Sequence, residues 1–213
     1  MANHQDVETR CKCGEVRGRL RGASPQTVNH MTCYCDDCQA FAHHLGRADL
    51  LDEHGGSVIV QVAPRSLTFD RGADRIEGVR LSPKGLYRFY ASCCKTPVGN
   101  TPGPSIPFIG ITDELLRGAA DVRFEDVFGR SRAGTLEKFA IGTPSGTSRR
   151  DQLRMLAHVL PLLLGWKLRG RGWPHPFFDQ KTKEPRAPVS ILPATERDAL
   201  RARCGPTPTS GGS

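Results

Sequence analysis

The grouping of the cysteines constrains this chain more than any other feature. Seven of the eight cysteines lie between positions 11 and 94. They form the groups Cys11-Lys12-Cys13-Gly14, Cys33-Tyr34-Cys35-Asp36-Asp37-Cys38 and Cys93-Cys94. Residues two apart in an extended chain point to the same face, so each Cys-x-Cys pair presents two thiolates to one metal. Gly14 lets the chain turn after the first pair, and the turn at the two aspartates allows Cys38 to add a third sulfur. The spacing therefore predicts metal binding.

The number of sulfurs suggests two metal sites of different kinds. Zinc takes four protein ligands in a structural site, and three ligands plus water or substrate in a catalytic one. We expect one zinc site closed by Cys11, Cys13, Cys93 and Cys94, and one open, catalytic zinc site at Cys33, Cys35 and Cys38. In the alternative division the middle group is closed by Cys93 or Cys94, and the first pair is otherwise engaged. Zinc suits thiolate-rich tetrahedral sites best, although iron is chemically compatible with four sulfurs.

The cysteine content and the N-terminal sequence predict that this protein is in a reducing compartment. The N-terminus, MANHQDVETR, lacks the basic and apolar regions of a secretory signal. The longest apolar stretch, residues 155–164, is shorter than the roughly 20 residues that cross a bilayer. Eight cysteines in such a chain favour metal or redox chemistry over disulfides. We therefore expect a cytoplasmic protein with no transmembrane segment.

The rest of the pattern predicts a mainly β fold. The chain has 23 Gly and 16 Pro in 213 residues, which is typical of a turn-rich globular protein. Short β-like runs predict antiparallel strands at 16–20, 28–33, 57–62, 66–70, 76–81, 86–91 and 106–111. A helix is expected over residues 36–51, with Phe41 in the core and with Asp36 and Asp37 capping its start.

A change of character near residue 146 predicts a division into a β domain at 1–145 and an extension at 146–213. Ser148-x-x-Asp151 resembles a capping box and begins an apolar helix that runs toward Trp166. We expect Pro161 to kink or split this helix, and the helix to pack across the sheet, with a dimer contact or a membrane-surface role as alternatives. An irregular arm follows, with aromatic residues that can dock onto the core, and the last ten residues are expected to be disordered. The docking residues are Trp173, Phe177 and Phe178.

The positive charge is concentrated in that extension. The net charge is +8, and residues 146–213 carry 12 basic and 5 acidic side chains against 18 and 17 in residues 1–145. Such a segment attracts nucleic acid or another anionic partner, while a solvated surface is the commoner explanation.

The three cysteine motifs resemble those of the glutathione-dependent formaldehyde-activating enzyme (GFA) family. That family's pattern is Cys-x-Cys-Gly, then Cys-x-Cys-x-x-Cys, then Cys-x-x-Cys-Gly-Ser-Pro, and the resemblance covers about residues 9–112. It implies a small β fold, a structural zinc on the outer groups and a catalytic zinc on the middle group. It also implies carbon–sulfur lyase chemistry, in which glutathione and formaldehyde combine into S-hydroxymethylglutathione. Ala91 occupies the position of the first cysteine in the family's third motif, Cys-x-x-Cys-Gly-Ser-Pro. Cys93 is therefore expected to substitute as the ligand.

Three functions follow from these observations. The leading hypothesis is a zinc-dependent lyase acting on a thiol adduct, in which the substrate sulfur is the fourth ligand beside Cys33, Cys35 and Cys38. The second is a non-catalytic zinc module that binds nucleic acid or an acidic partner through its basic extension. The third is a redox-responsive protein in which Cys93 and Cys94 form a reversible disulfide. Residues treated as surface or incidental are His43, His44, Cys204 and Arg149, Arg150 and Arg154.

Overall fold

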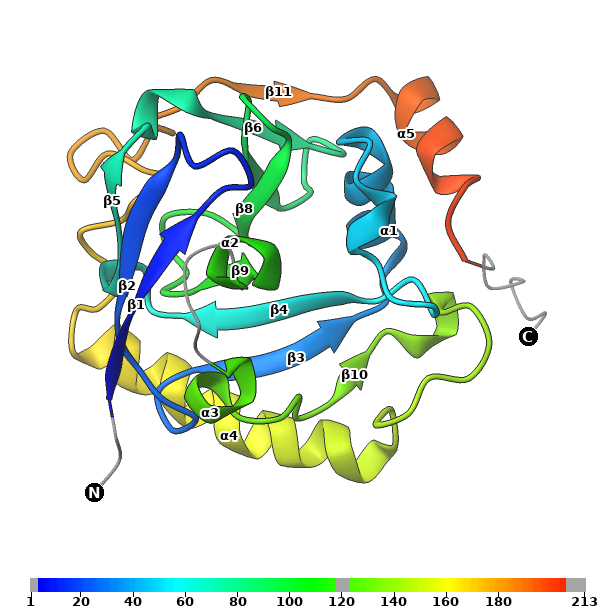
Figure 1. Cartoon of the computed structure of the whole chain (residues 1–213), viewed down its shortest axis with the longest axis horizontal. Helices are drawn as coiled ribbons and strands as arrows, with labels where there is room; N and C mark the ends of the chain where they lie inside the picture. Colours follow the sequence, from blue (N-terminus) through cyan, green and yellow to red (C-terminus); the bar gives the residue numbers. More distant parts are fainter. Residues whose placement is uncertain (1–3, 118–122, 206–213) are drawn as a thin grey trace.

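Two β-sheets form the body of the protein in a computed structural model that describes residues 4–117 and 123–205 (Figure 1). The smaller sheet has the strand order β1 (Gln5–Arg10), β2 (Arg17–Ala23) and β5 (Leu67–Arg71). The larger sheet has the order β10 (Gly134–Thr135), β3 (Asn29–Cys33), β4 (Ser57–Val62), β9 (Ile109–Thr112), β8 (Thr96–Thr101), β7 (Tyr87–Ala91), β6 (Ile76–Arg80) and β11 (Val189–Ile191). Only the edge pairs β10–β3 and β11–β6 are parallel in the described chain. The predicted mainly β, antiparallel fold is confirmed.

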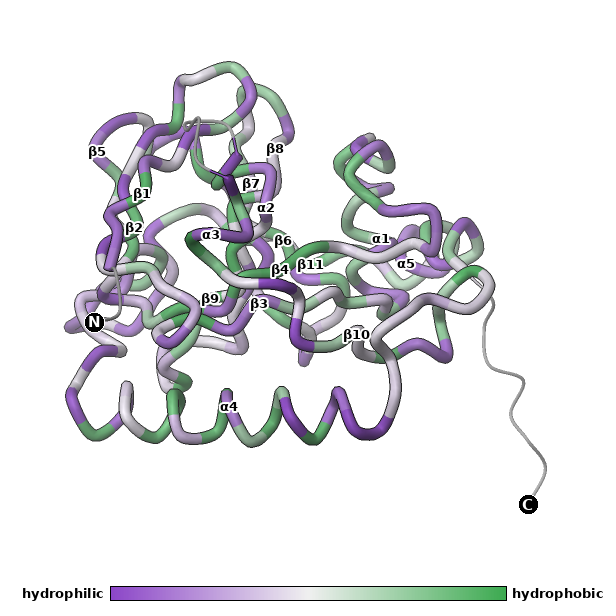
Figure 2. Tube along the Cα trace, turned by 60° about the horizontal axis from the view of Figure 1, so that its bottom comes forward, coloured by the Kyte–Doolittle hydropathy of each residue, from purple (hydrophilic) through white to green (hydrophobic). Residues whose placement is uncertain are grey.

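Five α-helices surround the sheets in the described residues. They are α1 (Asp36–His44), α2 (Asp113–Arg117), α3 (Phe124–Phe128), α4 (Arg149–Leu168) and α5 (Ala194–Arg201). Short 3₁₀ turns occupy Ala48–Leu50, Pro64–Ser66, Ala73–Arg75 and Glu137–Phe139. Helix α1 packs against α5, and α4 forms a separate outer layer along one side of the fold (Figure 2). None of these helices is long and apolar enough to cross a membrane.

The aromatic arm after α4 completes the main core. Phe177 and Phe178 are 2% and 0% exposed, and Phe177 stacks on Phe89 of β7 at 4.1 Å between ring centroids. Phe178 meets Phe89 and Tyr87 edge-on. The predicted docking of this arm is therefore confirmed for both phenylalanines, and Trp173 packs against the same cluster.

The sequence prediction missed several elements. Strand β1 buries only Val7 and Thr9 among charged neighbours, so it has almost no apolar signal. Strand β8 contains Pro97 and Gly99, residues that usually mark turns, and a bulge between them, where Val98 has no partner on β7, accommodates the proline. The arm after Gly170 was expected to be irregular, but it contains β11 and α5.

Two helices differ from their predictions. The helix expected over 36–51 ends at His44, because Gly46 adopts a positive φ of 66° that breaks the helix before the 3₁₀ turn. Helix α4 begins at the predicted Ser148 cap but runs through Pro161 without a break (Figure 2). Pro161 and Ala157, whose carbonyl loses its helical partner, are both exposed, so water can satisfy that carbonyl.

The tail is better ordered at its start than expected. The Cys204 thiol lies 3.5 Å from the Asp36 carbonyl, and the Gly205 amide donates to Gln39 Oε1 at 2.8 Å. These contacts hold residues 204 and 205 against α1. The remainder of the predicted disordered end, residues 206–213, lies outside the described residues.

Candidate metal centres

Four cysteines from two distant turns meet at one point. Cys11 and Cys13 lie in the turn between β1 and β2, and Cys93 and Cys94 lie in the turn between β7 and β8. The four sulfurs lie within 4.8 Å of one another. The Sγ atom of Cys93 is 3.3 Å from that of Cys13 and 4.0 Å from that of Cys11. We call this set the four-cysteine group.

The backbone of the β7–β8 turn brings the adjacent cysteines to one side. The amides of Cys94 and Lys95 both donate to the Ala91 carbonyl, and Lys95 has a φ of 56°. Successive side chains in a straight strand would point to opposite faces. The tight turn removes that restriction, so the sulfurs of Cys93 and Cys94 can lie on the same side of the chain.

Hydrogen bonds join this turn to the β1–β2 turn. The Lys12 amide donates to Thr96 Oγ1 at 3.0 Å, and that hydroxyl lies 3.1 Å from the Cys94 sulfur. The Val16 amide donates to the Cys11 sulfur at 3.3 Å. Thr96 therefore organises both halves of the four-cysteine group, although the sequence analysis did not single it out.

The middle cysteines converge where β3 passes into α1. Cys33 is the last residue of β3, Cys35 caps α1, and Cys38 lies in the first helical turn. The Cys38 amide donates to the Cys35 sulfur at 3.2 Å, which is the capping bond of the helix. The sulfurs of these residues lie within 4.8 Å of one another and form the three-cysteine group. Cys93 and Cys94 belong to the other group, so the alternative division is not the grouping in this structure.

A buried arginine lies beside the three-cysteine group. Arg88 of β7 is 2% exposed, and its Nη1 lies 3.7 Å from the Cys38 sulfur. Its Nη2 is 4.0 Å from Asp37, and its guanidinium lies 5.5 Å from the centre of the Phe41 ring. The Nε atom of Arg88 is buried and has no hydrogen-bond partner among the described residues. A full positive charge is thus placed against the sulfur of Cys38.

A small cavity borders the same point. Its volume is about 30 Å³, and Cys38 and Arg88 both line it. Phe41 of α1, Asn100 of β8 and Asp113 of α2 form other parts of the wall. Burial raises the pKa of Asp113 against the effect of its partner Arg117. The three-cysteine group therefore adjoins a space for a very small molecule, with one fixed cation and one carboxyl that burial shifts toward its protonated form.

Ionisation is unevenly shared within the three-cysteine group. Hydrogen bonds from Cys33 and Cys35 hold the pKa of Cys38 well below its usual range despite its burial, and Arg88 adds to this effect. The same contacts, with burial, raise the pKa of Cys35. A hydrogen bond with Cys35 favours the Cys33 thiolate, but contact with Cys38 and burial raise its pKa to about 12. One thiolate therefore forms at the expense of its neighbours.

The four-cysteine group shows the same behaviour. Burial opposes ionisation of Cys94, yet hydrogen bonds from Thr96 and Cys13 lower its pKa to about 6. Burial and contacts with neighbouring sulfurs raise the pKa values of Cys11 and Cys93. All sulfurs of either group can ionise together only if a cation offsets their charges.

Both groups fit a metal ion. Four sulfurs held about 2.3 Å from a central zinc lie about 3.8 Å from one another. The sulfur distances of 3.3, 3.6, 3.9 and 4.0 Å in the four-cysteine group bracket that value. The three-cysteine group offers one donor fewer, with no fourth cysteine, histidine or carboxylate grouped with it among the described residues. These cysteines could hold metal ions.

Other candidates from the sequence lie elsewhere or act differently. His43 and His44 are not grouped with the three sulfurs, and His44 Nδ1 lies 3.3 Å from Glu196 of α5. The predicted helix cap at Asp36 and Asp37 is wrong, because Cys35 is the N-cap and the aspartates follow in the first turn. There they form ion pairs with Arg201 of α5. Phe41 is buried, as expected.

Comparison with known proteins gives a family without a known function. No curated protein matches the chain. Among solved structures, a crystal structure of a Rhodobacter sphaeroides protein is similar over 54% of this chain and 92% of that chain, with 14% identity and a TM-score of 0.38. Similarity at that level transfers no function. The family model for DUF6151, a family of unknown function, matches residues 4–188. Because the match covers most of the chain, this protein belongs to the DUF6151 family.

Proposed function

We propose that each cysteine group binds one zinc ion, and that the three-cysteine group holds the sulfur of a small-molecule thiol during carbon–sulfur bond chemistry. The observation that carries the proposal is the position of the three-cysteine group, which adjoins the cavity lined by Cys38 and Arg88. Three protein ligands with an open fourth position are the pattern of catalytic zinc, whereas four sulfurs are the pattern of structural zinc. The four-cysteine group therefore has the structural role.

Charge supports this assignment of roles. Zinc with three thiolates carries a net charge of −1, and the guanidinium of Arg88 offsets it at 3.7 Å from Cys38. A fourth, external thiolate makes the centre −2, which a buried site without a cation would resist. Arg88 thus favours the arrival of an anionic sulfur at the open position.

The reaction we propose follows the resemblance to the GFA family. A zinc ion held by Cys33, Cys35 and Cys38 would supply the positive charge that keeps an external thiol ionised at neutral pH. The sulfur of that thiol forms a bond to the carbonyl carbon of formaldehyde, the carbonyl electron pair moves to oxygen, and that oxygen takes a proton from solvent. The product is the S-hydroxymethyl thioether of the thiol, and the reverse reaction cleaves the same bond. Glutathione is the thiol that the resemblance suggests.

Arg88 has a defined part in this proposal. Its Nε hydrogen is buried and free of partners within the described residues, and Arg88 lines the cavity. A fixed donor of this kind stabilises the oxygen as negative charge develops on it. The cavity that Arg88 lines has room for an aldehyde of one carbon.

The test compares one ligand from each group. Native mass spectrometry with elemental analysis should find two zinc ions in the wild-type chain. Cys35→Ser should lose one zinc and thiol-dependent turnover but keep its fold, while Cys13→Ser should lose the other zinc together with thermal stability. Glutathione should also change the charge-transfer bands of cobalt in the three-cysteine group of the wild type, and should leave the Cys35→Ser spectrum unchanged.

The opposite results would point to a purely structural role. If cobalt at Cys33, Cys35 and Cys38 already shows four sulfur ligands and ignores every added thiol, the catalytic proposal fails. Loss of the fold in Cys35→Ser would lead to the same conclusion, because a metal at the three-cysteine group would then be structural.

A further inference from the structure

Helix α4 exposes a row of leucines. Its inner face buries Met155, Val159 and Trp166 against the rest of the protein. The outer face carries five leucines at intervals of three or four residues, which places them on one side of the helix. Their exposed fractions range from 42% to 77%, and they are Leu153, Leu156, Leu160, Leu164 and Leu168. Contiguous apolar exposure of this kind marks a surface that another apolar body covers.

Positive charge borders this leucine face at both ends. Arg149 and Arg150 begin α4, and Lys167 lies in its last turn. Asp151 is the helix's one acidic residue, and it already contacts Ser148 and Arg154. The helix therefore carries a net positive charge, as does the whole segment 146–213.

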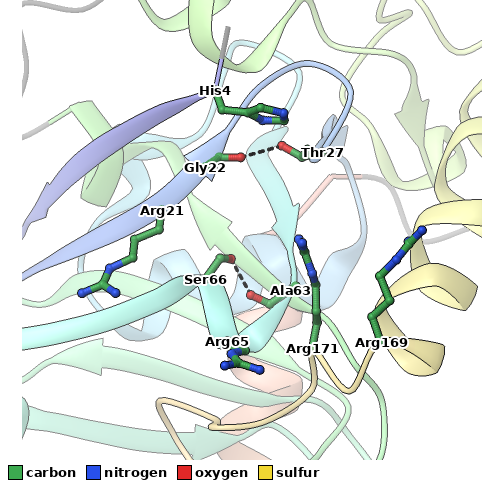
Figure 3. A pocket seen from close by; sticks show the side chains of 9 residues that line it. All are labelled: His4, Arg21, Gly22, Thr27, Ala63, Arg65, Ser66, Arg169 and Arg171. Carbon is green, nitrogen blue, oxygen red and sulfur yellow. Dashed lines mark hydrogen bonds between the residues drawn. The ribbon is translucent and has the colours of Figure 1, made fainter. Parts of the chain in front are cut away.

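A basic pocket adjoins the C-terminal end of the same helix. It has a volume of about 470 Å³, and it is lined by Arg21 of β2, by Arg65 next to β5, and by Arg169 and Arg171 directly after α4 (Figure 3). None of the described residues that line it is acidic. The Arg65 amide donates to the Arg171 carbonyl at 3.0 Å, which joins the end of α4 to the turn before β5.

The four arginines have no acidic partner within the described residues, since the ion pairs found there involve other side chains. Figure 3 shows Arg169 and Arg171 extending from the chain after α4, with Arg21 on the far side of the pocket. The guanidinium groups are spread around the pocket, and each can donate hydrogen bonds to a phosphate oxygen of an anionic surface.

We propose that α4 docks this protein on the surface of an anionic phospholipid membrane, with the leucine face in the interface and the arginine pocket near lipid phosphates. A helix with exposed leucines and basic flanks is the pattern of an interfacial helix, and anionic lipid attracts each nearby cation. A second copy of the chain is a poorer occupant. Both ends of α4 are basic, so two such helices placed face to face repel each other in either direction.

The experiment measures cosedimentation of the full-length, zinc-loaded protein with lipid vesicles. One set of vesicles is pure phosphatidylcholine, and the other contains equal parts of phosphatidylcholine and phosphatidylglycerol. We expect binding to the anionic vesicles, little binding to the neutral ones, and loss of binding at high salt because salt screens the charge contribution.

Two double variants separate the apolar and basic contributions. Leu160→Gln with Leu164→Gln should lower the partition coefficient by about tenfold or more, because both side chains would otherwise leave water. The control Ile191→Gln changes a residue of β11 that is 51% exposed, and it should bind as the wild type does. All variants should keep the wild-type zinc content and thermal stability.

The basic contribution is tested in the same assay. Arg169→Gln with Arg171→Gln should weaken binding by about 25-fold, at about fivefold for each cation near the anionic surface. The control Arg130→Gln removes one charge from a side chain that is 91% exposed and lies outside the pocket, and it should change little.

Four results would overturn the proposal. They are absence of binding to both vesicles, equal binding to both, and vesicle binding that neither double variant weakens. The fourth is a dimer in light scattering that the leucine double variant converts to a monomer, since a second copy would then cover the leucine face.

Isothermal titration with inorganic pyrophosphate distinguishes a lipid headgroup from a free anion. Tight pyrophosphate binding without vesicle binding would make the pocket a site for soluble phosphates and would also refute membrane docking.

Discussion

Replacing the buried Arg88 tests whether its positive charge stabilises a metal ion at the three-cysteine group. Arg88→Met removes the cation 3.7 Å from Cys38 and leaves a side chain of similar length in the core. Asp37 keeps its second partner, Arg201, so the substitution does not leave a carboxylate unpaired. We expect the three-cysteine group to lose metal affinity while the four-cysteine group is unaffected.

The size of the effect can be bounded from the geometry. Two unit charges 3.7 Å apart attract by about 4.5 kcal/mol at an effective dielectric constant of about 20. That figure is an upper bound, because a zinc–trithiolate spreads its single negative charge over several atoms. Residues that support metal ligands usually contribute about 10- to 100-fold in affinity. We therefore predict a loss of about 30-fold, or about 2 kcal/mol.

The assay is zinc competition with a chromophoric chelator, in which the two groups release metal in separate phases. Cys35→Ser identifies the phase of the three-cysteine group. Arg80→Met is the matched control, because Arg80 is another strand arginine whose guanidinium stacks on Tyr87 at 4.4 Å. Arg88→Lys should recover part of the affinity. An unchanged three-cysteine phase in Arg88→Met, or equal weakening of both phases, would refute the reasoning.

Three further predictions concern stability. Phe178→Ala should lower the free energy of unfolding by about 3–5 kcal/mol in urea denaturation, because Phe178 is fully buried; Leu168→Ala, at a residue 77% exposed, should change it by less than about 0.5 kcal/mol. Burial lowers the pKa of His175 to about 4, so the unfolded chain binds the proton first and stability should fall as pH drops from about 6.5 toward 4, by about 3 kcal/mol in total. His175→Gln should show a shallower fall over that range, and an identical slope would contradict this prediction. Cys13→Ser should remove one zinc and lower the melting temperature in calorimetry, whereas unchanged metal content would exclude Cys13 as a ligand.

The fold was predictable where the chain alternates strongly between apolar and polar residues. The predicted strand at 57–62 coincides with β4, and the prediction at 28–33 nearly coincides with β3. Strand β11 was not predictable in this way. It is only three residues long, Val189 is partly buried and the other two residues are exposed, and it forms because the edge of β6 offers free backbone groups.

The division of the chain into residues 1–145 and 146–213 remains a proposal. The capping box at Ser148 marked the start of α4 correctly. The apolar run from Ser148 toward Trp166 also predicted a helix, but it did not show which face of that helix is buried. A helix that is apolar on several sides can pack in more than one orientation, and contacts with β3 and β10 select the face that carries Met155 and Val159.

The sequence by itself determined which sulfurs are local partners. Cys11 with Cys13, and Cys33 with Cys35 and Cys38, are brought close by spacing and turn chemistry that any reader of the chain can follow. The sulfur count also suggested that Cys93 and Cys94 join the first pair, but it left another division open, and the tertiary structure decided between the two. It placed Cys93 against Cys13, 80 residues away, and Arg88 against Cys38, 50 residues away. Strand pairing sets those positions, and pairing depends on how the whole hydrophobic core closes. A local pattern carries no information about which distant side chain will arrive beside it.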